Sequence, residues 1–103
     1  MRSRPTSRMP AEIQVHSCMS LAGRGAVLIG FVRSGKAVEG QTTEPISLDG
    51  LINPGLKVIA VERLSSMGSG FPAVGLTFAD PPTVAALRDA LPTGTLLQLE
   101  DRA

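Results

Sequence analysis

Short stretches of apolar or alternating residues follow one another along this chain, and glycines and prolines separate them. This pattern is typical of β-strands joined by turns. The most apolar stretch runs from Ala26 to Val32 and is apolar on both faces, with Gly30 where we expect a bulge or bend. Ser34-Gly35-Lys36 then provides a turn. The segment from Gly23 to Gln41 is therefore predicted to form a strand, a tight turn and a second strand.

The same pattern predicts four further strands, over residues 12–19, 42–48, 56–64 and 73–79. In the first of them, Ile13 and Val15 share one face, and Glu12, Gln14 and His16 share the other. The second strand is weakened by Pro45 and is followed by two turn signals, Asp49-Gly50 and Asn53-Pro54-Gly55. Residues 65–72 are rich in serine and glycine, so we expect a loop there that is mobile.

One short helix is predicted after Asp80-Pro81-Pro82-Thr83. Asp or Thr can cap a helix N-terminus, and Pro is tolerated in the first turn. The apolar side of this helix would carry Val84, Leu87 and Leu91, and Pro92 would end it.

The corner Gly23-Arg24-Gly25 and the glycines after it resemble the entry hairpin of the second domain of elongation factor Tu, the β-barrel shared by translational GTPases. The positions that carry the resemblance after this corner are Val27, Gly30, Val32, Gly35, Val38 and Gly40. Val74-Gly75-Leu76, and Gly94 with Leu96 and Leu97, extend it over roughly residues 13–99. The latter match implies a closing strand that begins near Leu96 and ends at Leu99 or Glu100. The resemblance implies an all-β fold: a small, closed or nearly closed antiparallel β-barrel, with one short helix in the C-terminal half that plugs one end.

In that family the barrel helps to hold the aminoacylated end of tRNA through acidic residues and an aromatic. His16, Ser17 and Met19 occupy the matching positions here, so this recognition does not carry over. We expect a non-enzymatic binding module that has no cofactor.

A chain of 103 residues fits one domain. We assign residues 1–11 to a flexible basic leader and residues 12–103 to a single β-barrel domain. The net charge is +1, from 10 basic and 9 acidic residues. The leader holds three of the bases, Arg2, Arg4 and Arg8, so the rest of the chain has 7 bases against 9 acids, a net charge of −2. This balance argues against a strongly basic nucleic-acid binder.

Cys18 is the single cysteine, so no disulfide can form within the chain. We see neither a secretory signal nor an apolar run that could span a membrane, and we expect a cytoplasmic protein without membrane contact. His16 and Cys18 stand two residues apart, and we expect both on one strand face. Two ligands are too few for a metal site, so we assign neither metal-binding nor catalytic residues.

One motif has the spacing of a phosphate-binding loop. Residues 30–37 read G-x-x-x-x-G-K-A, but Ala37 stands where Ser or Thr would hold Mg²⁺. A true loop of this kind also opens a helix, whereas this segment is predicted to form a hairpin. We expect no nucleotide binding.

Two hypotheses about the partner stay open. In the first, Arg24, Arg33 and Lys36 contact phosphates, and the module binds RNA, the ribosome or a translation-linked protein. In the second, the outward-facing Ile29 and Phe31 meet another protein or a second copy of the chain, giving a homo-oligomer, because a barrel interior can bury only one face of their strand.

Overall fold

The computed structural model describes residues 10–65, 68 and 70–101. More than half of these residues lie in strands, and one short α-helix follows the seventh strand. The elements are β1 (Ala11–Leu21), β2 (Gly25–Ser34), β3 (Gln41–Thr43), β4 (Ile46–Leu48), β5 (Leu51–Asn53), β6 (Val58–Leu64), β7 (Ala73–Phe78), α1 (Val84–Ala90) and β8 (Leu96–Asp101). The predicted leader lies almost wholly outside the described residues, and so do residues 66, 67 and 69 of the predicted loop. β1 begins at Ala11, one residue before the predicted domain boundary.

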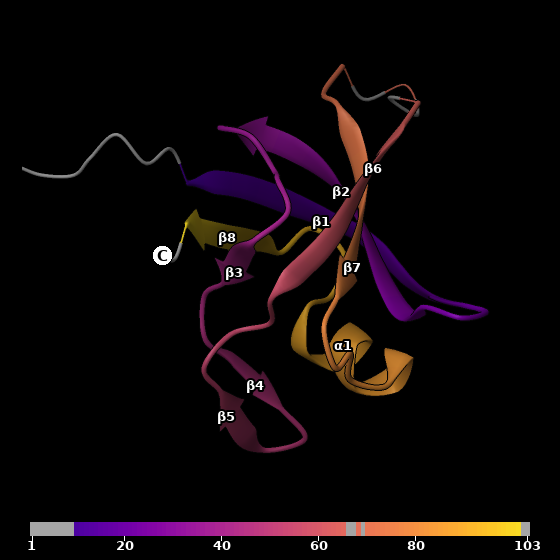
Figure 1. The fold of residues 1–103 in the computed structure, drawn as a ribbon, viewed down its shortest axis with the longest axis vertical. Helices are drawn as coiled ribbons and strands as arrows, with labels where there is room; N and C mark the ends of the chain where they lie inside the picture. The colour runs from indigo at the N-terminus through magenta and orange to yellow at the C-terminus, as the bar shows by residue number, and fades with distance from the viewer. Residues whose placement is uncertain (1–9, 66–67, 69, 102–103) are drawn as a thin grey trace, which may run out of the picture.

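Six strands form one curled antiparallel sheet in the order β3-β8-β1-β2-β7-β6, and β4 and β5 form a separate hairpin (Figure 1). The edge strands β3 and β6 approach each other at a single bridge between Thr42 and Lys57. Two backbone hydrogen bonds flank this bridge: the N–H of Gly40 donates to the C=O of Val58, and the N–H of Thr43 donates to the C=O of Leu56.

No continuous ladder joins the two edges within the described part of the chain, so the sheet is a half-barrel that does not close. The antiparallel β-fold and the single short helix are confirmed, and a closed barrel is not. β3 has only three residues, because Pro45 ends this stretch, and β6 is bulged between Val58 and Ala60. Both features limit pairing between the edges.

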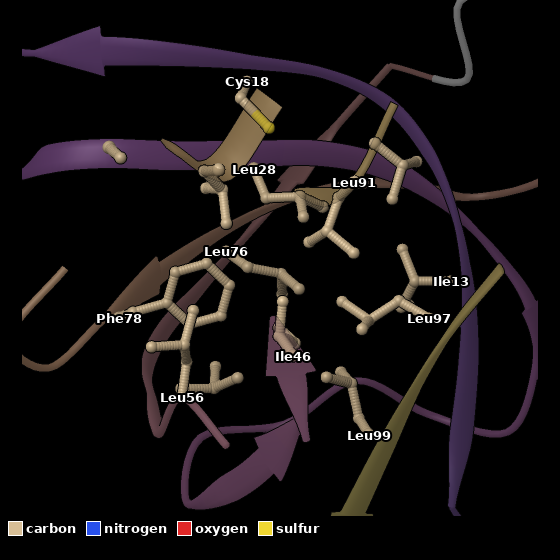
Figure 2. Packing of buried hydrophobic residues seen from close by; sticks show 14 of the residues in the cluster. Ile13, Cys18, Leu28, Ile46, Leu56, Leu76, Phe78, Leu91, Leu97 and Leu99 are labelled. Atoms are coloured by element: carbon tan, nitrogen blue, oxygen red, sulfur yellow. The ribbon is translucent and has the colours of Figure 1, made fainter. Parts of the chain in front are cut away.

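The concave face of the sheet holds the core (Figure 2). Its most deeply buried large side chains include Ile13, Leu28, Leu76, Phe78, Leu97 and Leu99. Helix α1 covers one end of this core and buries Leu87. As predicted, Thr83 caps the helix: its Oγ1 accepts a hydrogen bond from the N–H of Ala86 at 3.1 Å. The cap and the apolar stripe together hold this helix of only seven residues in place.

The predicted hairpin over residues 23–41 is wrong in its partner. β2 pairs with β1, through the turn at residues 22–24, and with β7. Residues 36–40 form no strand, and β3 pairs with β8. The reason lies at Gly35, which has φ +70° and packs so closely on Pro10 that a Cβ would approach the Pro10 carbonyl oxygen to 2.1 Å. The chain therefore leaves the sheet at Gly35, and no helix follows the segment that has phosphate-loop spacing.

A bulge in β1 corrects a second expectation. The register passes from Val15 opposite Gly30 to Ser17 opposite Ile29, so His16 is the extra residue. Cys18 consequently turns into the core (Figure 2), whereas His16 stays on the outer face against Phe31. The two side chains do not share a face. Gly30 itself is not bulged; it lies opposite the β1 bulge.

The region 42–53 contains more structure than the pattern predicted. Glu44 and Pro45 divide the expected strand 42–48 into β3 and β4. Asp49 and Gly50, with φ of 50° and 82°, then form the turn of a β4–β5 hairpin. Positive φ at both central residues is the signature of the two-residue hairpin turn that Asp-Gly favours. The strands predicted over 56–64, 73–79 and 96–100 are confirmed within two residues at either end.

Candidate interaction groove

An apolar groove crosses the outer face of the sheet, which is the face opposite the core. Its volume is about 390 Å³, and four neighbouring strands line it. We call it the outer groove; its lining residues are His16, Ser17, Met19 and Leu21 of β1, Val27 and Ile29 of β2, Gly75 of β7, and Glu62 and Leu64 of β6.

The hollow exists because small residues flank Ile29. In the strand register, Ile29 has Ser17 on one side and Gly75 on the other. A Cβ at Gly75 would lie 3.5 Å from Ile29 Cδ1, 3.7 Å from Val27 Cγ1 and 3.9 Å from Leu64 Cδ1. These are ordinary contact distances, and Gly75 does not have the positive φ that strains other residues. Gly75 therefore forms the floor of the groove, because it has no side chain to fill the space above it.

Larger apolar side chains surround this hollow and form the walls of the groove. Val27 is only 1% exposed although it points away from the core, whereas Met19 and Leu64 are 40% and 39% exposed. Burying a large apolar side chain stabilises a contact by about 1.5–3 kcal/mol relative to leaving it in water. Met19 and Leu64 are still partly exposed, so a ligand or partner that covered them would gain part of this stabilisation.

Polar groups mark the ends of the groove. Toward the start of β2, Arg24 forms an ion pair with Glu62 at 2.5 Å. This pair joins the β1–β2 turn to β6 and so crosses β7. The hydrogen bond and charge of Arg24 lower the pKa of Glu62. Toward the end of β2, the rings of His16 and Phe31 meet edge to face, with 5.5 Å between their centroids.

The structure does not bring the three predicted RNA contacts together. Arg24 precedes β2 and Arg33 is near its end, nine residues apart, which at about 3.3 Å per residue gives a separation on the order of 30 Å. Arg33 donates a hydrogen bond to Gln14 Oε1 at 2.6 Å and lies 4.3 Å above the ring of Phe71. Lys36 follows in the segment after β2. Arg33 and Lys36 thus share one end of the strand, and the cation of Arg24 is already engaged by a carboxylate.

The interface candidates lie at the outer groove. Ile29 lines it, and Phe31 borders it through its contact with His16. Sequence reasoning did not identify Gly75, Leu64 or Met19 as part of the same surface. The available signal was Gly75 itself, because a glycine inside an apolar strand often leaves room for another group.

A second cavity, of about 320 Å³, lies between β1 and the end of α1, and Cys18 and Arg88 line it. Nε and Nη2 of Arg88 donate hydrogen bonds to the C=O of Cys18 at 3.1 and 2.9 Å. Burial raises the pKa of the Cys18 thiol, and the nearby Arg88 charge opposes that rise. Among the described residues no cluster of three His, Cys, Asp or Glu side chains could hold a metal ion. In the same part of the chain, the helix is too short to cross a membrane.

Comparison of the chain with protein-family models, curated proteins and solved structures finds no match. The likeness to the second domain of elongation factor Tu therefore remains a prediction.

Proposed function

We propose that this chain is a non-enzymatic interaction module whose outer groove binds apolar side chains of a partner protein. The observation that carries this proposal is the hollow above Gly75, which Val27 and Ile29 line and which the exposed Met19 and Leu64 flank. Its volume of about 390 Å³ falls within the range of roughly 300–1,000 Å³ for binding pockets.

The chemistry of the lining favours an uncharged, apolar occupant. Glu62 is the single carboxylate of the groove, and Arg24 neutralises it. A methionine wall can adapt its shape to different side chains, because Met is unbranched and polarisable. An apolar segment of another protein fits these features better than an anionic ligand does.

RNA or ribosome contact is the second candidate function. Arg33 and Lys36 favour it, since they lie at the same end of β2 and neither has a carboxylate partner within the described residues. Two cations and a net negative body give it less support than the groove gives to protein binding.

Filling the floor of the groove tests the first function. The Gly75→Leu variant should occupy the hollow with its own side chain, and Leu64→Ser should remove one wall. Ile52→Ser is the matched control, because Ile52 is an exposed apolar residue on the β4–β5 hairpin, outside the groove. Random dodecapeptides displayed on phage would be selected on the wild-type protein, and the synthetic peptides then titrated by NMR against each variant.

We expect apolar peptides whose affinity falls at least tenfold in Gly75→Leu and Leu64→Ser, stays unchanged in Ile52→Ser, and changes little between 0.1 and 1 M NaCl. Failure to enrich any peptide, or equal affinity for Gly75→Leu, would remove the proposal. The RNA function predicts instead that a ribosomal RNA fragment binds with a strong salt dependence. Replacement of Arg33 and Lys36 by Ala should then flatten the salt slope by up to about two units.

A further inference from the structure

The edge of β6 is incompletely paired. β6 is the last strand of the sheet and has β7 on one side. On its other side, the contacts with the β3 edge end at Val58, whose C=O accepts from Gly40. Beyond that point, residues 60–64 have no strand beside them within the described part of the chain.

The hydrogen bonds of β7 show which backbone groups of β6 face outward. The N–H of Val32 donates to the C=O of Pro72, which turns the backbone groups of residues 72, 74 and 76 toward β2. Residues 73, 75 and 77 therefore face β6, in agreement with the bond from Ala79 N–H to the C=O of Lys57. Their partners are Leu64, Glu62 and Ala60.

The N–H and C=O groups of the two residues in between, Val61 and Arg63, must consequently point to the free edge. These four groups form a short template for another strand, since exposed edges pair readily with extended chains.

The charge along this edge is positive. Arg63 lies on the free edge and Lys57 just before it, at the bridge to Thr42; both are exposed and have no carboxylate partner among the described residues, and the carboxylate of Glu62 is held by Arg24. The side chains next to the edge include the half-buried Val61 and the exposed Leu64, both apolar. The three arginines of the leader have the same charge as this edge. An acidic segment from another molecule therefore complements the edge better than the chain's own leader does.

We propose that the free edge of β6 accepts an extended acidic segment of a partner protein as an added antiparallel strand. Its backbone would exchange hydrogen bonds with Val61 and Arg63, its carboxylate would lie opposite Arg63, and apolar residues would lie opposite Val61 and Leu64. The bulge between Val58 and Ala60 limits the added pairing to about five residues. This site is separate from the outer groove, although Leu64 borders both.

A designed peptide tests the proposal on the unmodified protein. The probe is Ac-Thr-Leu-Glu-Thr-Val-Val-Thr-NH2, in which Leu, Glu, Thr and Val would lie opposite Leu64, Arg63, Glu62 and Val61. One N-methylated version blocks the N–H groups of Glu and of the first Val, which would face β6. The matched control is methylated at the Thr between them, whose N–H would face solvent. NMR titration of the labelled protein gives the affinities, and the Val61 and Arg63 amides report the site.

We expect the first methylated peptide to bind at least tenfold more weakly than the parent, and the control to stay within about twofold of it. On the protein side, Arg63→Ala removes the charge, whereas Arg63→Pro also removes the outward N–H, which an edge strand tolerates. Arg63→Pro should bind the parent peptide at least fivefold more weakly than Arg63→Ala.

Absence of binding by the parent peptide would overturn the proposal, and so would equal losses for the two methylated peptides. Sedimentation of the protein alone tests whether a second copy of the chain occupies the edge instead. A dimer that Arg63→Pro dissociates would assign the edge to that second copy and would also overturn the proposal. Gly75→Leu should leave peptide binding at the edge unchanged, so failure of the groove proposal can be told apart from failure of this one.

Discussion

Two glycines on adjacent central strands allow a quantitative test of the packing. Gly30 faces the core side of β1, where a Cβ would lie 2.6 Å from Ile13 Cγ2 and 2.8 Å from the carbonyl oxygen of Gln14. At Gly75 the nearest atom would be 3.5 Å away. The same substitution, glycine to alanine, should therefore have opposite effects at the two sites.

For Gly30→Ala, overpacking costs about 1–3 kcal/mol, and the reduced entropy of the unfolded chain returns about 0.4–1 kcal/mol. We expect a net loss of about 1–2 kcal/mol in the free energy of unfolding. Gly75→Ala keeps only the favourable part, so it should be neutral or stabilise the protein by up to about 1 kcal/mol.

Urea unfolding followed by circular dichroism measures both effects, since the chain has no Trp or Tyr to serve as a fluorescent reporter. With a urea dependence of about 2 kcal/mol per M, in the middle of the usual range, the midpoint of Gly30→Ala should fall by about 0.5–1 M. Equal midpoints for the two variants would refute the close approach of β1 and β2 at Gly30 and the open floor at Gly75.

Two further predictions concern the turn after β2 and the buried thiol. Gly35→Ala should cost on the order of 2–3 kcal/mol of unfolding free energy, because Gly35 has positive φ and its Cβ would collide with Pro10. The control is Gly40→Ala, also at positive φ but in open space, which should cost only about 1 kcal/mol. Equal denaturant midpoints would contradict the contact with Pro10. Burial raises the pKa of Cys18, so its contribution to stability is complete below the thiol's unfolded pKa of about 8.5 and is lost as pH rises through the folded pKa. Above about pH 8.5, stability should therefore fall more steeply in the wild type than in Cys18→Ala, and parallel pH profiles would show that the thiol is not buried.

Local patterns predicted the fold well where local chemistry decides it. Thr83 caps the helix as expected, and the strands around Val61 and Leu76 follow from their apolar runs. The pairing of strands was harder to predict, because turn residues show where the chain bends but not which strand the next segment pairs with. Gly35 illustrates this limit: a turn there was predicted, but the contact with Pro10 that takes the chain out of the sheet depends on a residue 25 positions earlier in the sequence.

The candidate site could be predicted only in part, for a related reason. That β2 is apolar on both faces was visible in the sequence, and it led to Ile29 and Phe31. The rest of the groove depends on which residues stand beside Ile29 in the register. Because of the β1 bulge at His16, Ser17 and not His16 stands opposite Ile29, and β7 contributes Gly75 on the other side. A one-residue change in register would exchange the residues on the two faces, so no local pattern could have placed these neighbours.

The same register explains why the outer face is neither fully covered nor fully open. Along β2, Val27 lies between Met19 and Thr77, and these neighbours help to bury it almost completely. One pair further along, the small neighbours of Ile29 leave the hollow. The sheet thus covers part of its second apolar face with its own side chains and leaves one gap, which lies beside the unpaired edge of β6. A partner that used both features would combine apolar contact at the gap with backbone pairing at the edge. Binding energies measured separately in Gly75→Leu and Arg63→Pro would then add in the double variant if the two surfaces act independently.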